Sequence, residues 1–247
     1  MAVTRRSPIT IPLADPHACG HDVRVRALGA TPLFRSLAPE ALAEVDRRCG
    51  MRSIDAGEAV HLAGRPAERL YVVATGAVKL TRPTPDGVEV IIDVLGPGGF
   101  LGALPALGED TYREDAWALT PGCLLSLTTP DLDAVIAAHP AVARDALTAI
   151  GRRLREAQAA GERATSASVE ARLAATLLLL AERLGRAHEG ATLIDVPLSR
   201  EDLASLAGCA PETASRVLAR WQRAGVIRSG RRWIAVVDRS ALATLAG

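Results

Sequence analysis

The spacing of hydrophobic and polar positions changes along the chain and predicts two kinds of structure. Between residues 51 and 129, short β-rich runs such as RLYVVATG (69–76) alternate with glycine and proline turns. Several short strands at this spacing are typical of a sandwich or barrel, and we predict a jelly roll, a double-stranded β-helix. After residue 129 the apolar positions recur at helical spacing, so the whole chain is predicted to be α+β.

A long helix is predicted after Pro140, because proline is tolerated mainly in the first turn of a helix. One stripe of this helix is apolar, and it consists of Val142, Ala143, Ala146, Leu147, Ile150 and Leu154. A helix that joins two domains has little else to pack on, so we predict that the stripe packs on a second copy of the chain. The alternative is packing on its own sandwich. The small, polar residues 161–168 (GERATSAS) are predicted to form a hinge.

The C-terminal part of the chain has the features of a helix-turn-helix. Ser199 is a suitable N-cap, and Asp202 follows three residues later, near the capping-box pattern. Gly208 permits a tight turn between two helices. Pro211 stands where the second helix would begin, a position at which the missing N–H is not needed.

The second helix and the segment that follows it carry side chains suited to DNA. Glu212, Ser215 and Arg216 share one face near the helix N-terminus, which is the end that enters the major groove in a helix-turn-helix. Arginine suits guanine, and glutamate can accept a hydrogen bond from cytosine. Residues 226–237 predict a β-hairpin, a wing, whose basic tip suits phosphate contact. The residues predicted to contact DNA are Ser199, Arg200, Pro211, Glu212, Thr213, Ser215, Arg216, Arg220, Arg231 and Arg232.

The charge distribution supports a polyanionic partner for the C-terminal part alone. The net charge is only +1, but residues 31–130 hold 9 basic and 13 acidic side chains, whereas residues 205–239 hold 7 arginines and 2 acidic side chains. No apolar run is long enough to span a membrane, and no signal peptide is recognisable, so we expect a cytoplasmic protein. The 4 cysteines are too scattered for a disulfide framework.

These patterns divide the 247 residues into four parts. We predict an N-terminal, partly irregular arm (1–30), a jelly-roll sensor domain (31–130), a dimerisation helix with its hinge (131–168) and a winged helix-turn-helix domain (169–247).

The order of these parts resembles the CRP/FNR family of bacterial transcription regulators. The specific part is LSREDLASLAGCAPETASRVLARWQRAGVI (198–227), and AGEAVHLAGRPAERLYVVATGAVKL (56–80) and GPGGFLG (96–102) match the sandwich more loosely. The resemblance implies a cyclic-nucleotide-binding-like sandwich, a homodimer, double-stranded DNA as partner and, for an activator, RNA polymerase. Glu212 and Arg216 match the glutamate and arginine that the recognition helix of the family usually carries.

Ser215 resembles the FNR-like branch of the family, which implies a palindromic site with TTGAT-like half-sites. The cyclic-nucleotide pocket of the family would correspond to Gly102, Ala103, Leu104, Arg113 and Glu114. Ala103 cannot bond a ribose, and the carboxylate of Glu114 would repel a cyclic phosphate, so the sequence argues against cAMP.

FNR-type members hold an iron–sulfur cluster with cysteines, and this chain departs from their spacing. Cys19, Cys49 and Cys123 with His21 are candidate ligands for a cluster or for zinc, although lone cysteines are commonly core residues. Haem bound through His21 or His61 is a further alternative for a redox or gas sensor.

Two other classes were weighed against a sensing regulator. A cupin-like metal enzyme would need clustered sandwich histidines, and only His61 lies in the strand-rich stretch, so we do not expect an enzyme. A DNA-binding protein whose sandwich only supports the dimer and senses nothing is the other alternative that the sequence leaves open. The effector, if there is one, is not specified by the sequence.

Overall fold

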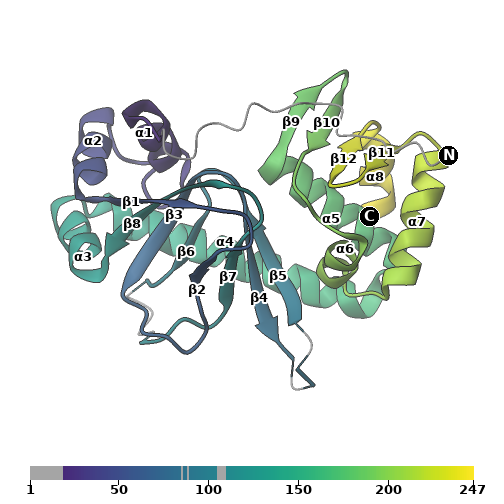
Figure 1. Cartoon of the computed structure of the whole chain (residues 1–247), viewed down its shortest axis with the longest axis horizontal. Helices are drawn as coiled ribbons and strands as arrows, with labels where there is room; N and C mark the ends of the chain where they lie inside the picture. The colour runs from purple at the N-terminus through teal and green to yellow at the C-terminus, as the bar shows by residue number, and fades with distance from the viewer. Residues whose placement is uncertain (1–18, 85, 88, 105–109) are drawn as a thin grey trace. The chain divides into compact units, whose positions relative to one another are not determined.

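A computed structural model describes residues 19–84, 86–87, 89–104 and 110–247. The chain forms two compact units, one built around the β-sandwich and one around the C-terminal helices (Figure 1). The predicted α+β architecture, a sandwich followed by a winged helix-turn-helix, is confirmed. Residues 1–18 of the predicted arm lie outside the described part of the chain.

The sandwich consists of two antiparallel four-stranded sheets, with strand orders β1-β8-β3-β6 and β2-β7-β4-β5. The strands of the first sheet are β1 (Gly50–Ile54), β8 (Gly122–Thr128), β3 (Arg69–Thr75) and β6 (Phe100–Gly102). The strands of the second are β2 (Ala59–His61), β7 (Asp115–Ala118), β4 (Val78–Pro83) and β5 (Glu89–Leu95). Successive side chains point to opposite faces of a strand, so Leu124 packs between the sheets while Leu125 packs toward the covering helices.

Three short helices cover the outer face of the first sheet: α1 (His21–Ala30), α2 (Pro39–Arg48) and α3 (Thr129–Ala138). Within the arm that was predicted to be partly irregular, residues 21–30 form a helix, and α1 buries Ala27 and Leu28 in the core. Its weak amphipathic periodicity hid this helix from the sequence analysis, and only the tertiary contact reveals it.

The long helix α4 (Ala141–Ser166) begins after Pro140, as predicted. Residues 161–166 of the predicted hinge are part of this helix, and the break is confined to the next two residues before α5 (Val169–Leu184). The apolar residues of α4 that were predicted to form one stripe do not all face the same way. Val142 and Ala146 pack on the core of the sandwich, whereas Leu147 and Leu154 are exposed.

The C-terminal unit contains α5, α6 (Arg200–Ala207), α7 (Pro211–Arg223) and α8 (Arg239–Ala246). A four-stranded sheet of order β11-β12-β10-β9 completes it, with β9 (Gly185–His188), β10 (Ala191–Ile194), β11 (Ile227–Gly230) and β12 (Trp233–Val236). Gly185 follows the last residue of α5, and its backbone is not left-handed. A side chain there would meet the carbonyl oxygen of Ala181 at 2.1 Å, so close packing requires the glycine.

Candidate nucleic-acid interface

The helix α6 and the turn after it adopt the geometry expected from the sequence. The Ser199 hydroxyl accepts a hydrogen bond from the backbone N–H of Asp202 (3.0 Å), and the Asp202 carboxylate accepts one from the N–H of Ser199. This reciprocal capping box fixes where α6 begins. Gly208 is left-handed, with φ of 61°, and ends the helix so that the chain can turn into α7.

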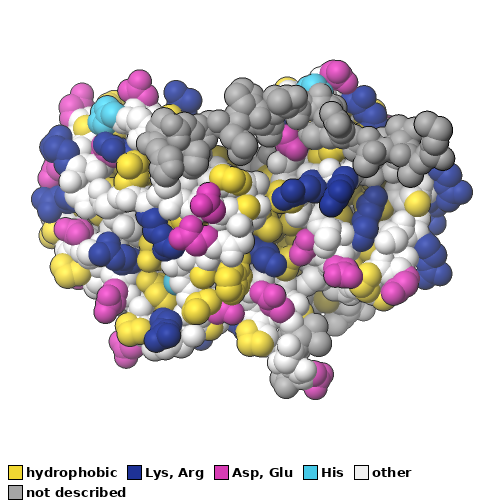
Figure 2. Space-filling view, viewed as in Figure 1, with side chains coloured by type: hydrophobic (Ala, Val, Ile, Leu, Met, Phe, Trp, Pro, Cys, Tyr) yellow, Lys and Arg dark blue, Asp and Glu magenta, His cyan; other side chains and the backbone are white. Residues whose placement is uncertain are grey.

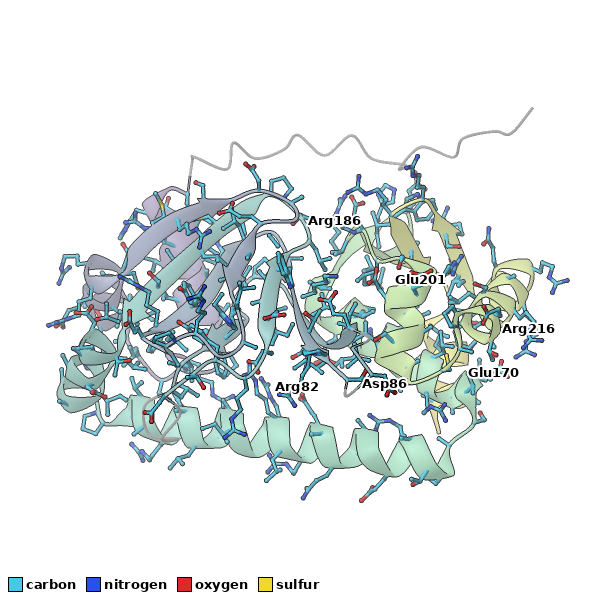
Figure 3. The ribbon with its side chains drawn as sticks, turned by 60° about the horizontal axis from the view of Figure 1, so that its bottom comes forward. Arg82, Asp86, Glu170, Arg186, Glu201 and Arg216 are labelled. Carbon is cyan, nitrogen blue, oxygen red and sulfur yellow. The ribbon has the colours of Figure 1, made fainter. Side chains whose placement is uncertain are left out.

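The helix α7 has one buried face and one polar face. Ala214, Val217, Leu218 and Trp221 form the buried face. Glu212 and Arg216 lie exposed on the opposite face near the N-terminus, with Ser215 half-buried beside them. Arg216 points away from the domain (Figure 3), and Lys and Arg side chains lie along the edge of the molecule where α7 is drawn (Figure 2). The sequence-predicted reading residues therefore share one accessible surface.

Glu170, in the first turn of α5, binds two side chains of α7. One of its carboxylate oxygens accepts a hydrogen bond from Nε1 of Trp221 (2.9 Å), and the other forms an ion pair with Arg220 (2.5 Å). Burial acts to raise the pKa of Glu170, but these two partners outweigh it and hold the pKa below its ordinary value. The sequence analysis placed Arg220 among the DNA contacts, whereas the structure gives it this internal partner.

Arg172 holds the turn of the helix-turn-helix through backbone carbonyls. Its guanidinium donates to the carbonyl oxygens of Ala207 and Gly208 and to that of Ala167, each at 2.9 Å. The last carbonyls of a helix have no partner within the helix, so these bonds satisfy groups that would otherwise need water. Neither Glu170 nor Arg172 was singled out from the sequence, because a charged residue on an amphipathic helix is usually solvated and their partners are distant in sequence.

The wing is the predicted hairpin. β11 and β12 pair with Gly230 opposite Trp233, so Arg231 and Arg232 form its exposed tip. Arg232 has φ of 72°, a conformation that glycine adopts more readily. Arg200, at the start of α6, is turned inward instead, and its Nη2 donates to the hydroxyl of Ser229 at 3.0 Å.

Two aromatic side chains stack near Gly102, one of the residues that correspond to the cyclic-nucleotide pocket. The rings of His61 and Tyr112 stack with centroids 3.9 Å apart, and both residues are buried. Burial lowers the pKa of His61 to about 4, so the imidazole is neutral at physiological pH. The Tyr112 hydroxyl lies 3.3 Å from both the backbone N and O of Arg69.

The other predicted pocket residues do not converge on a ligand in the described part of the chain. Ala103 is buried, and its N–H donates to the carbonyl oxygen of Arg69 (2.9 Å), while Leu104 packs on the core. Glu114 pairs with Arg82 at 3.6 Å, and Arg113 is exposed. A side chain at Gly102 would meet the Arg69 carbonyl oxygen at 2.5 Å.

The three candidate cysteine ligands gather in one hydrophobic cluster, which also contains Ala27 and Leu28 of α1. Burial, together with a hydrogen bond to Cys19, raises the pKa of Cys123 to about 12, and burial raises that of Cys49 to about 12. Metal ligation requires thiolates, which these surroundings disfavour.

His21 turns to Asp46, with Nδ1 3.0 Å from Oδ2, and Arg24 binds the same carboxylate. Within residues 19–84, 86–87, 89–104 and 110–247, no three Cys, His, Asp or Glu side chains form a group that could hold a metal ion. The cysteines fit core packing among the described residues.

In the described ranges, no helix is both long enough and apolar enough to cross a membrane. The sandwich and the winged helix-turn-helix together define a class of protein, a DNA-binding regulator with an N-terminal sensor-like domain.

Comparisons with known proteins agree with this class. A family model for the cyclic nucleotide-binding domain matches residues 51–139, and one for the Crp-like helix-turn-helix domain matches residues 171–245. The cyclic AMP receptor protein of Thermus thermophilus is 33% identical over 87% of this chain and 97% of that protein. A CRP-like cAMP-activated global transcriptional regulator of Mycobacterium tuberculosis is 29% identical over 87% of this chain and 96% of that protein.

Among solved structures, FixK2 of Bradyrhizobium japonicum matches with a TM-score of 0.71 and 26% identity, over 81% of this chain and 98% of that chain. The chain belongs to the CRP/FNR family of DNA-binding transcription regulators. The relatives are regulators, which confirms the expectation that the chain is not an enzyme.

Proposed function

We propose that the protein is a homodimeric regulator that binds a palindromic, TTGAT-like DNA site and does not depend on cAMP. The observation that carries this proposal is the polar N-terminal end of α7, where Glu212, Ser215 and Arg216 share one accessible surface above a fully packed opposite face.

Three sets of contacts fix the position of α7 and therefore of the surface formed by Glu212, Ser215 and Arg216. The capping box starts α6, Arg172 binds the carbonyls of the turn, and Glu170 binds Trp221 on the buried side of α7. A helix held in this way loses little freedom on binding, so its side chains meet base edges already oriented. Arg216 would donate to guanine, and Glu212 would accept from cytosine. Pro211 and Thr213 flank them on the first turn, and Arg231 and Arg232 of the wing would contact phosphates.

The exposed leucines of α4 support the homodimer. Leu147 is 69% exposed and Leu154 is 58% exposed, and they are seven residues apart on one side of the helix. Pairing two copies of this stripe would remove it from water. A two-fold dimer would then present two recognition helices to half-sites about 34 Å apart, one turn of DNA.

Independence from cAMP rests on the chemistry of the sandwich. Ala103 offers no side-chain acceptor for a ribose hydroxyl, and Glu114, which pairs with Arg82, places a carboxylate in the region that corresponds to the phosphate site of the family. His61 and Tyr112 stack on each other and occupy the space between strands with an apolar, neutral surface. Two of the relatives are described as cAMP proteins, so a direct test is needed.

The test of DNA reading compares two arginines on the same helix. Arg216→Ala removes a charge at the N-terminal end of α7, and Arg223→Ala removes the same charge at the exposed C-terminal end. Fluorescence anisotropy would measure the Kd for a palindromic site and for single-base variants. Arg216→Ala should weaken the matched site by about 1–3 kcal/mol and relax discrimination at one base pair, whereas Arg223→Ala should preserve discrimination.

Equal losses for matched and mismatched sites in Arg216→Ala would contradict the reading role of Arg216. The same titration with and without added cAMP tests the effector proposal. An unchanged Kd is expected, and a clear tightening by cAMP would refute cAMP independence while leaving the DNA-reading proposal intact.

A further inference from the structure

A chain of hydrogen bonds crosses the C-terminal unit and joins three of its elements. Nη2 of Arg200, the first residue of α6, donates to the hydroxyl of Ser229 in β11 at 3.0 Å. The same hydroxyl donates to Oε1 of Gln222 near the end of α7 at 2.9 Å. Ser229 is therefore both acceptor and donor, and one hydroxyl connects the first helix, the recognition helix and the wing.

This chain is shielded from water at its centre. Ser229 is only 6% exposed, and burial lowers the pKa of Arg200 below its ordinary value. Nη1 of Arg200 is buried with no hydrogen-bond partner among the described residues, and no described carboxylate forms an ion pair with this guanidinium. A half-buried charge without a counter-charge is a poor source of stability, because its partial desolvation is not offset. Arg200 therefore contributes to the relative positions of α6, α7 and β11, which its hydrogen bonds connect.

The position of Ser229 shows what that geometry controls. It lies two residues before Arg231 on the strand that leads into the wing tip, and its backbone is paired with Ile234 on the returning strand. The pairing of β12 with β10 holds one side of the hairpin, whereas β11 is the edge strand, so its position depends on β12 and on the contacts of its own side chains. Gln222 stands one turn and a half beyond Arg216 on α7. The hydroxyl thus links the base of the wing to the helix that reads bases.

We propose that Arg200, Ser229 and Gln222 form a positioning relay that sets the direction of the wing relative to the recognition helix, so that Arg231 and Arg232 reach phosphates while Arg216 reads bases. Arg200 is a positioning residue in this arrangement, and it acts through Ser229 instead of touching DNA. The relay rests on the proposed function, since it has an effect only if the wing contacts DNA.

The salt dependence of DNA binding separates this role from a purely structural one. Each phosphate contact contributes about 0.9 to the slope of log Kd against log salt. Ser229→Ala removes both hydrogen bonds of the hydroxyl and changes no charge, so a lower slope in this variant cannot come from a lost cation. Ser229→Thr keeps the hydroxyl on a β-branched residue suited to a strand and is the matched control.

Ser229→Ala is expected to lower the slope of log Kd against log salt and to leave the discrimination between matched and mismatched sites unchanged. If one contact per protomer is lost, the slope of a dimer falls by about 1.8. Between about 50 and about 200 mM salt, wild type should then lose roughly twelvefold more affinity than Ser229→Ala. Discrimination between matched and mismatched sites should be unchanged, and Ser229→Thr should restore most of the slope. Circular dichroism and thermal unfolding would show that each variant is folded.

A double-mutant comparison tests whether the relay acts through the wing. Ser229→Ala should have no further effect on the slope in a chain that already carries Arg231→Ala and Arg232→Ala. Arg200→Met should behave in the same way. A full, additive loss for Arg200→Met in that background would mean that Arg200 contacts phosphate directly, which overturns the relay. If Ser229→Ala does not fold, Gln222→Met is measured in its place, because it removes only the hydrogen bond between Ser229 and Gln222.

The outcomes distinguish the relay from the function on which it rests. If the variant lacking both wing arginines has the wild-type slope, the wing does not contact phosphates, and both proposals about the wing are refuted. If that variant loses slope while folded Ser229→Ala or Gln222→Met does not, only the relay is refuted.

Discussion

Replacing the exposed leucines of α4 is the most direct perturbation of the proposed dimer. The variant Leu147→Ala with Leu154→Ala shortens two side chains that are 69% and 58% exposed in the single chain. Shortening leucine to alanine removes the equivalent of about three methylene groups, each contributing about 0.8 kcal/mol when fully buried. If the dimer buries the exposed fractions, the loss is about 1.7 and about 1.4 kcal/mol. Two protomers together lose up to about 6 kcal/mol, which corresponds to about four orders of magnitude in the dimer Kd.

The variant should leave the folded monomer nearly unchanged, because both side chains face water there and alanine is a good helix former. Sedimentation velocity over a dilution series would give the dimer Kd, and circular dichroism would report the helix content. Leu179→Ala is the matched control, since this leucine is 39% exposed but lies on α5, outside the proposed interface. A dimer Kd within tenfold of wild type for the double variant would refute the assignment of this stripe to the interface.

Three further predictions concern single side chains. The pKa of about 4 for His61 lies below its unfolded value of about 6.5, so the unfolded chain binds a proton that the folded chain does not, and stability falls as pH falls between these values. Relative to pH 8, urea unfolding at pH 5 should show an extra loss of about 2 kcal/mol in wild type that is absent in His61→Leu; equal pH profiles would contradict this. Arg232→Gly relieves a left-handed residue, so thermal stability should be unchanged or slightly higher, while the salt slope of DNA binding falls by about 1.8; a marked destabilisation would show that the side chain supports the fold. Glu170→Ala leaves the indole N–H of Trp221 without its partner and should cost about 1–3 kcal/mol in chemical unfolding, against less than about 0.5 kcal/mol for the exposed control Glu182→Ala; equal effects would mean that the anchor contributes nothing.

The local rules of helix and turn formation explain why the DNA-binding domain could be predicted closely. The capping pair Ser199 and Asp202, the left-handed Gly208 and Pro211 at the first turn act over a few residues, so their effect can be read directly from the sequence. The buried and polar faces of α7 follow from helical periodicity alone. The strand-rich texture likewise predicted the sandwich, because side-chain alternation and turn residues are local signals.

Long-range contacts account for the predictions that failed or were incomplete. The helix α1 has almost no amphipathic periodicity and is stabilised by packing Ala27 and Leu28 on the sandwich, so the sequence showed only an irregular arm. The small, polar composition of residues 161–166 indicated a hinge, but small residues such as alanine are also good helix formers, and α4 continues through them. The three candidate ligand cysteines share a core cluster because burial determined their positions.

The sequence by itself determined the order of the elements and the polar face of α7 that we propose reads bases, because each depends on residues close together in the chain. Only the tertiary structure decided which charged residues bind partners within the protein. Arg200, Arg220 and Arg172 have the same guanidinium and similar helical settings in the sequence, yet one binds Ser229, one binds Glu170 and one binds three carbonyls. Their partners lie between 5 and 50 residues away, and the longer of these separations leave no local signal. The direction of a charged side chain is a property of the folded surroundings, since the free-energy difference between solvent and an internal partner is small and depends on exact placement.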